Sequence, residues 1–193
     1  PVLATLIETY PGIHLTRRGD PFTTLARAIV GQQISVKAAQ TIWDRVLAAC
    51  RADGSGRLDP ATLQRKRLAT LRTCGLSERK ALYIRDLAKH FASARLDPAT
   101  WSALDDEALI EALVDVKGIG RWTAEMFLMF HEMRADVLPL DDIGLQKAVA
   151  MHYFDGERPT LAALRALGER WQPYRSVATW YLWRSLDPIP VEY

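Results

Sequence analysis

Apolar residues recur three and four positions apart along most of this chain, which is the spacing of one face of an α-helix. The segment that Pro21 opens is an example, with an apolar face made of Phe22, Leu25, Ala26, Ile29 and Val30. No stretch alternates between apolar and polar residues for long enough to predict a β-strand. The sequence therefore predicts an all-α fold.

Capping residues and prolines indicate where several of these helices begin. Ser35 and Ser77 stand where a capping hydroxyl is expected, and Asp–Pro pairs at 59–60 and 97–98 also predict helix starts. The Asp-Gly-Ser-Gly segment 53–56 predicts a loop. Helices are accordingly expected at 2–9, from 21 up to Gly31, at 34–49, from 60, at 78–91, from 98, from about 105 to 114, at 121–132, from 143 to about 154, at 160–167 and at 175–184.

The composition of the 193 residues limits the classes of protein to consider. Hydrophobic residues make up 49% and charged residues 25%, as in ordinary globular proteins, and a net charge of +2 is too small to indicate nucleic acid by itself. No apolar run reaches the roughly 18 residues of a membrane-spanning helix, and the N-terminus lacks the flanks of a secretion signal. Cys50, Cys74 and the four scattered histidines form no metal-binding spacing, so no metal enzyme is indicated.

Two glycines flank one apolar residue in the turn Lys117-Gly118-Ile119-Gly120, between two predicted helices. Glycine lets the backbone turn sharply and approach a ligand closely, because it has no Cβ. The helix that follows directs its unpaired N–H groups back at the turn, which favours a bound phosphate. Since such turns also occur in ordinary helical bundles, the turn alone predicts either a phosphate-binding hairpin or a structural corner.

Asp141 and Asp142 follow Pro139-Leu140 directly before the next predicted helix. One aspartate at the N-cap accepts backbone N–H bonds and stabilises a helix by about 1 kcal/mol. Capping needs only one carboxylate, and two adjacent ones repel each other. An ionised carboxylate is a poor general acid, so the pair is better suited to stabilising a positive centre or activating a water.

A basic run lies between positions 65 and 80, where a single acid, Glu78, accompanies six basic residues. A solvated helix face is the simpler interpretation, and a flank along a nucleic-acid backbone is the alternative. The six are Arg65, Lys66, Arg67, Arg72, Arg79 and Lys80.

The hairpin V-K-G-I-G-R-W-T-A at 116–124, followed about twenty residues later by L-P-L-D-D, resembles the helix–hairpin–helix DNA glycosylases. Within these, the match is to the 3-methyladenine DNA glycosylase II (alkylpurine DNA glycosylase) branch. Three further segments are similar to that branch and occur in its order: A-R-A-I-V-G-Q-Q-I-S at 26–35, G-L-S-E-R-K-A at 75–81 and W-Q-P-Y-R-S at 171–176. The chain resembles the compact members, which lack the additional N-terminal α/β domain of many relatives.

The resemblance implies that Asp142 is the catalytic aspartate and that Asp141 is the helix cap or a loop partner. Such enzymes flip a damaged nucleotide out of the duplex, because the glycosidic bond cannot be reached in the stack. Cleavage leaves an oxocarbenium-like sugar, which a carboxylate stabilises while water adds to C1′. An alkylated purine is already positive and leaves as a neutral base, so no protein acid is needed. The expected activity is hydrolysis at alkylated bases such as 3-methyladenine, a step of base excision repair that leaves an abasic site.

Trp122 stands where strand-cutting members of the family carry a lysine that forms a Schiff base with the sugar. The resemblance therefore implies a monofunctional enzyme, with Trp122 stacking as a wall of the base pocket. Trp183 resembles a second pocket aromatic, with core packing beside Trp180 and Tyr181 as the alternative. Met126 stands where the branch can carry a tyrosine, which leaves the base preference open.

Gln33 resembles the residue that fills the gap left by the flipped base, and an ordinary polar loop residue is the alternative. The resemblance also implies that the hairpin binds the DNA backbone and that its carbonyls can hold a Na⁺ or K⁺ bridging to phosphate, with no other cofactor required. The backbone-binding residues expected are Lys117, Gly118, Gly120, Arg121 and Thr123, and the carbonyls are those of Val114, Val116 and Ile119.

The loop 134–139 is the clearest candidate for a domain boundary. Residues 21–136 are expected to form one helical lobe carrying the helix–hairpin–helix at about 107–132. Residues 1–20 and 137–193 are expected to form a second lobe carrying the catalytic aspartate, with the active-site cleft between the lobes.

The expected partner is double-stranded DNA containing alkylated bases, bound by a monomer. The expected location is the bacterial cytoplasm with its nucleoid, or the nucleus of a eukaryote. Two alternatives stay open: a glycosylase for another class of lesion, and a non-catalytic helix–hairpin–helix DNA-binding module, which would tolerate loss of Asp142. A helical structural protein without a nucleic-acid partner is a more distant alternative.

Overall fold

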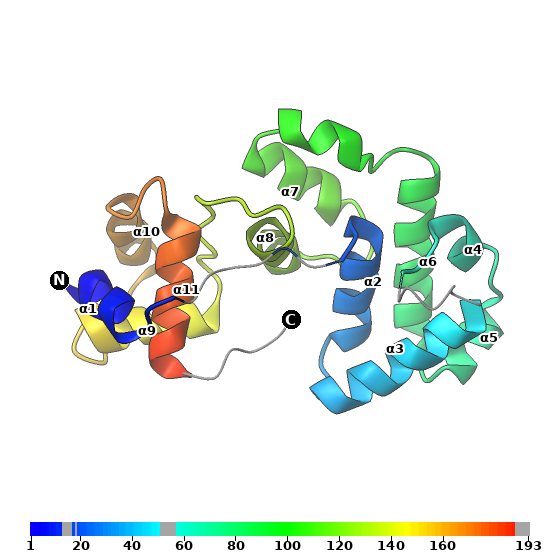
Figure 1. Ribbon diagram of the computed structural model, residues 1–193, viewed down its shortest axis with the longest axis horizontal. Helices are drawn as coiled ribbons and strands as arrows, with labels where there is room; N and C mark the ends of the chain where they lie inside the picture. Colours follow the sequence, from blue (N-terminus) through cyan, green and yellow to red (C-terminus); the bar gives the residue numbers. More distant parts are fainter. Residues whose placement is uncertain (13–16, 18, 51–56, 188–193) are drawn as a thin grey trace. The chain divides into compact units, whose positions relative to one another are not determined.

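The computed structural model describes residues 1–12, 17, 19–50 and 57–187 (Figure 1). Over these ranges every regular element is a helix, which confirms the predicted all-α fold. The loop predicted at 53–56 lies outside the described residues. None of the described helices is long and apolar enough to cross a membrane.

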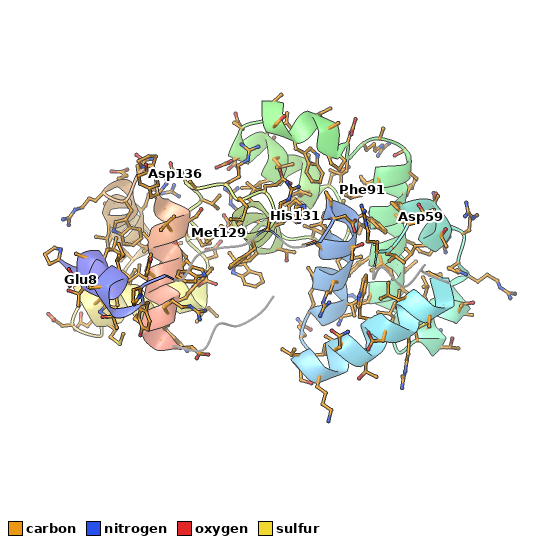
Figure 2. The ribbon with its side chains drawn as sticks, viewed as in Figure 1. Glu8, Asp59, Phe91, Met129, His131 and Asp136 are labelled. Atoms are coloured by element: carbon orange, nitrogen blue, oxygen red, sulfur yellow. The ribbon has the colours of Figure 1, made fainter. Side chains whose placement is uncertain are left out.

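The chain divides into two units by its internal contacts, one of residues 1–17 and 128–193 and the other of residues 18–127. The domain boundary predicted at residue 136 stays a prediction. The loop 134–137 at that position is held to the C-terminal helix by Ser176. The Ser176 hydroxyl donates to the Arg134 carbonyl (2.6 Å) and accepts from the Val137 N–H (2.9 Å). Asp136, labelled in Figure 2, also pairs with Arg175 at 2.8 Å.

In the unit of residues 18–127, α6 is the helix against which α2, α4 and α5 pack. A chain of edge-to-face aromatic contacts runs through this unit, from Phe22 to Phe91 (5.2 Å between ring centroids), Trp101 (6.1 Å) and Phe127 (5.6 Å). The helices are α2 (Pro21–Gly31), α3 (Val36–Cys50), α4 (Pro60–Gln64), α5 (Leu68–Thr73), α6 (Glu78–Ala92), the 3₁₀ helix η1 (Pro98–Ala103), α7 (Asp106–Val114) and most of α8 (Arg121–Phe130).

In the other unit, α11 packs against both α1 and α9. Their buried residues form one apolar cluster that includes Leu6, Leu145 and Leu182. The helices of this unit, besides the end of α8, are α1 (Val2–Thr9), α9 (Ile143–Tyr153), α10 (Leu161–Glu169) and α11 (Arg175–Leu186).

Most of the predicted helix starts are observed. The Ser77 hydroxyl accepts the Lys80 N–H and Asp59 accepts the Thr62 N–H, so both cap their helices. Asp97 instead starts the short 3₁₀ helix η1. The helix predicted to reach residue 132 ends at Phe130, because the chain turns back through Met133 (φ +59°) and the Arg134 N–H bonds to the Leu128 carbonyl.

Candidate active site

Asp142 is the N-cap of α9. Its backbone is extended (φ −71°, ψ 118°), and its Oδ1 accepts the Leu145 N–H at 2.6 Å. Of the two roles expected for Asp141, helix cap or loop partner, this excludes the cap, since Asp141 is exposed and precedes the capping position by one residue. Asp142 itself is only 8% exposed. A single buried carboxylate therefore stands at the helix N-terminus.

A second donor reaches the same carboxylate oxygen. The indole Nε1 of Trp183, on α11, donates to Asp142 Oδ1 at 2.7 Å. The Trp183 ring is also stacked on Phe130, with centroids 5.9 Å apart and planes inclined by 13°. Because Oδ1 receives two N–H groups from two different helices, the orientation of the carboxylate is fixed.

Gly144 leaves room for this contact. A Cβ at this position would lie 3.0 Å from Trp183 Nε1 and 3.1 Å from Asp142 Oδ1, so only glycine lets the indole and the carboxylate approach without displacement. Gly144 was not among the site residues predicted from the sequence. Its place within the first turn after the Asp–Asp pair was the available signal.

The loop that precedes Asp142 is held by Gln146 of α9, the helix that Asp142 caps. Gln146 Nε2 donates to the Leu140 carbonyl (2.8 Å), and Arg158 donates twice to Gln146 Oε1 (3.0 and 2.6 Å). The chain Arg158–Gln146–Leu140 thus braces the entry to the site. Neither side chain was among the site residues predicted from the sequence. Gln146, one turn after Asp142, could have been suspected, whereas the approach of Arg158 depends on tertiary packing.

The hairpin between α7 and α8 has the predicted turn. Gly118 has φ +88°, in the left-handed region, and an added Cβ would collide with the ring of Tyr83 beneath it. The Lys117 N–H donates to Asp86 Oδ2 at 2.9 Å. On the other side, Gln32 Nε2 donates to the Gly118 carbonyl at 2.9 Å. The hairpin is therefore anchored to α6 and to the segment that follows α2.

Arg121 bridges the two helices of the hairpin. Its Nη1 and Nη2 bind Glu107 of α7 in a bidentate pair (2.6 and 2.7 Å), and its Nε binds Glu125 of α8 (3.0 Å). The hydrogen bond from Arg121 lowers the pKa of Glu107, and the same bond raises the pKa of Arg121. In this structure the guanidinium is directed at two carboxylates of the hairpin itself, and its predicted contact with DNA stays a prediction.

Three backbone carbonyls were predicted to hold a monovalent cation. The Val116 carbonyl accepts the Ile119 N–H at 3.1 Å. No backbone N–H among the described residues donates to the carbonyls of Val114 or Ile119. Neutral oxygen ligands with unused lone pairs suit a hard monovalent cation, so this donor set fits one. As for other metals, no group of three or more His, Cys, Asp or Glu side chains within the described ranges could hold an ion.

The remaining predicted residues lie on or near α8 and α2. Trp122 is 40% exposed, and Met126, one turn further along the same face of α8, is buried. Gly120 is exposed and Thr123 is half-buried. Gln33, between α2 and α3, is exposed and has φ +58°. These residues belong to the unit of residues 18–127, whereas Asp142 and Trp183 belong to the other. The cleft expected between the lobes stays a prediction.

The basic run at 65–80, which extends from the end of α4 through α5 into α6, is partly engaged within the protein. Arg72 forms a 3.8 Å ion pair with Glu78, and Arg79 donates to the Tyr83 hydroxyl. Lys80 binds two backbone carbonyls. The simple picture of a solvated face therefore fails at Lys80.

Comparison with known proteins shows the family. Residues 26–173 match the family described as "HhH-GPD superfamily base excision DNA repair protein". The Bacillus subtilis protein YfjP is 30% identical over 188 residues, which are 96% of this chain and 66% of that protein, just under two thirds of its length.

Two solved structures are also similar. A crystal structure of DNA-3-methyladenine glycosidase from Bacillus halodurans has a TM-score of 0.88 and 39% identity, covering 96% of this chain and 84% of that one. The 3-methyladenine DNA glycosylase Mag1 of Schizosaccharomyces pombe, in complex with abasic DNA, has a TM-score of 0.79 and 29% identity, covering 97% and 93%. Both match nearly the whole of this chain.

Proposed function

Because this chain belongs to the HhH-GPD superfamily of base excision DNA repair proteins, we propose that it is a monofunctional DNA glycosylase for alkylated bases such as 3-methyladenine. Its substrate is double-stranded DNA, which it binds as a monomer, and its place is with the cell's DNA, in a bacterial cytoplasm or a eukaryotic nucleus. The names of the two similar structures support the choice of alkylated adenine. The observation that carries the proposal is the buried Asp142 carboxylate, oriented by the Leu145 N–H and the Trp183 indole.

The chemistry proposed for Asp142 is electrostatic. When the C1′–N bond breaks, the bonding electrons leave with the base and the sugar becomes oxocarbenium-like. An alkylated base that is already cationic departs as a neutral molecule, so the protein does not need to protonate the leaving base. A preoriented carboxylate stabilises the positive sugar without reorganising during the reaction. Water then adds to C1′, and its proton can pass to the same carboxylate.

The other residues of the proposed site lie on α8, on α11 and between α2 and α3. Trp122 and Met126 of α8 would form the base-stacking wall, with Trp183 beside the catalytic carboxylate. Trp122 has no amine, so it cannot form a Schiff base and the product is an abasic site. Gln33 would fill the gap left by the flipped nucleotide.

The hairpin would hold the DNA backbone. The N–H groups of Gly118 and Gly120 precede α8 and that of Thr123 lies in its first turn, the end at which a helix attracts phosphate. Lys117 adds an exposed cation beside them. A Na⁺ or K⁺ on the carbonyls of Val114, Val116 and Ile119 would place further positive charge before a phosphate, and no other cofactor is needed.

The test is single-turnover release of 3-methyladenine from methylated duplex DNA, with Asp142→Asn as the variant. Asparagine is as good an N-cap as aspartate, so α9 should keep its start and the variant should fold. Release by the native protein, lost in the variant while DNA binding persists, is expected. Binding by both without release by either would sink the alkyladenine assignment, and a panel of other lesions would then separate another glycosylase from a DNA-binding module.

A further inference from the structure

The segment between α2 and α3 has a backbone conformation that its own hydrogen bonds do little to stabilise. Gln33 has φ +58°, a left-handed conformation that is unfavourable for a residue with a Cβ. Such a conformation persists only where surrounding structure enforces it. The two backbone bonds nearest to it, from Gln32 N–H to Ile29 and from Ile34 N–H to Gly31, are both long at 3.4 Å. Other groups must therefore hold this segment.

Lys80 of α6 is one of those groups. Its Nζ donates to the Val30 carbonyl at 2.7 Å and to the Gln32 carbonyl at 2.6 Å. The last carbonyls of a helix have no intrahelical partner, and a cation near them is favourable. Burial lowers the pKa of Lys80, as expected for an ammonium withdrawn from water. Its ammonium thus fixes the peptide that directly precedes Gln33.

Gln32 extends the connection to the hairpin. While Lys80 holds its carbonyl, its side-chain Nε2 donates to the Gly118 carbonyl at 2.9 Å. The hairpin is held on α6 as well, through Asp86 and the Lys117 N–H. The segment carrying Gln33 and the turn carrying Gly118 are therefore both fastened to α6, one helix of the same unit.

We propose that Lys80 and Gln32 are positioning residues that keep Gln33 at a fixed place relative to the phosphate-binding hairpin. When a duplex is bound at Gly118, the position emptied by the flipped base would then lie at Gln33, and the loop would not have to change conformation to reach it. The inference rests on the proposed function, since it gives Gln33 a role in filling the gap. It also gives a physical role to the lysine of the G-L-S-E-R-K-A segment, whose ammonium donates to two backbone carbonyls of the protein.

The experiment separates insertion from chemistry. A duplex carrying an abasic-site analogue, with 2-aminopurine beside it, reports by fluorescence when a side chain enters the stack. Lys80→Met removes the ammonium and keeps most of the side-chain length, and Lys80→Arg keeps a donor. Lys89→Met, at an exposed position of the same helix, is the matched control. Binding, its salt dependence and thermal unfolding are measured on each variant.

With Lys80→Met, the fluorescence change on binding should fall toward that of Gln33→Ala. Single-turnover base release should slow by about tenfold, since even a small misplacement of the reacting groups lowers the rate. The affinity for undamaged DNA and its salt slope should stay near native values, and Lys80→Arg should recover part of both signals. Lys89→Met should leave insertion and release unchanged.

Two results would overturn the inference. A salt slope reduced by about one in Lys80→Met would mean that the ammonium binds a phosphate. Native fluorescence and release rate in the folded variant would mean that Lys80 only stabilises the fold. If Lys80→Met does not fold, Gln32→Ala, which cuts the link to Gly118 alone, gives the same two readouts. The fluorescence test needs no base release, so it remains decisive even if the native protein proves inactive on 3-methyladenine.

Discussion

The Trp183 indole N–H donates to Asp142 Oδ1 at 2.7 Å, the same oxygen that accepts the Leu145 N–H. One helix supplies the carboxylate and another fixes its direction. Trp183 therefore does more than the pocket-wall role proposed for it would require, because its ring stacks on Phe130 while its nitrogen orients the carboxylate.

Trp183→Phe separates these two roles, because it keeps an aromatic ring against Phe130 and removes only the N–H donor. A hydrogen bond to a charged group contributes about 1.5–3 kcal/mol, so base release should slow by roughly tenfold or more. DNA affinity should change little. Single-turnover rates and binding titrations on the same preparations check this, and an unchanged rate would contradict the orienting role. Trp171→Phe, in the apolar cluster of the same unit, is a control that should lower stability and not the rate.

Gly144→Ala tests the space between Trp183 and Asp142. The new methyl group would stand 3.0–3.1 Å from the two bonded atoms and push them apart by a few tenths of an ångström. Base release should fall by several-fold to about tenfold. Alanine favours helix over glycine by about 1 kcal/mol, so the melting temperature should not fall in proportion. A variant that loses stability and activity together would speak against this explanation.

Gly118→Ala tests the hairpin turn. The substitution meets both an unfavourable positive φ and the Tyr83 ring, so unfolding should become easier by more than about 2 kcal/mol. Gly120→Ala is the matched control, since its Cβ would enter open space and its φ is not positive. Urea unfolding of both variants gives the comparison. Equal losses would show that the Tyr83 contact is not decisive.

Glu107→Gln tests the bridge between α7 and α8 through its pH dependence. The folded pKa of Glu107 lies below its unfolded value of about 4.3, so the pair stabilises the fold above that pH. This contribution is lost as the pH falls through the lowered folded pKa. Both side chains are half exposed, so the difference from native at pH 7 should be only about 0.5 kcal/mol.

The free energies of unfolding of the native protein and Glu107→Gln should therefore converge as the pH falls below about 4. Urea unfolding from pH 7 down to pH 3 follows the two curves. Glu111→Gln, at an exposed position of the same helix, should track the native protein throughout. A difference that persists at low pH would mean that the effect of Glu107 is not ionic.

The sequence by itself determined the helical class, most helix starts and the hairpin, because these depend on local chemistry. Periodic apolar positions form one face of a helix, and a hydroxyl such as that of Ser77 caps its own helix. At position 118, glycine is the residue type that tolerates the conformation of the turn. The family resemblance, carried by the hairpin and the later Asp–Asp pair, also lay within the sequence. The sequence did not assign the N-cap of α9, because a shift of one residue in the helix start decides whether Asp141 or Asp142 reaches the Leu145 N–H.

Only the tertiary structure decided which distant groups meet. Trp183 lies 41 residues from Asp142, Lys80 lies 48 from Gln32, and Gln32 lies 86 from Gly118. No local pattern encodes such pairs, since they depend on how whole helices pack. Packing also decides the surroundings of the loop 134–137. Its sequence predicts a domain boundary, yet Ser176 binds the loop to α11. Periodicity predicts which face of a helix is buried, and packing alone decides what that face meets.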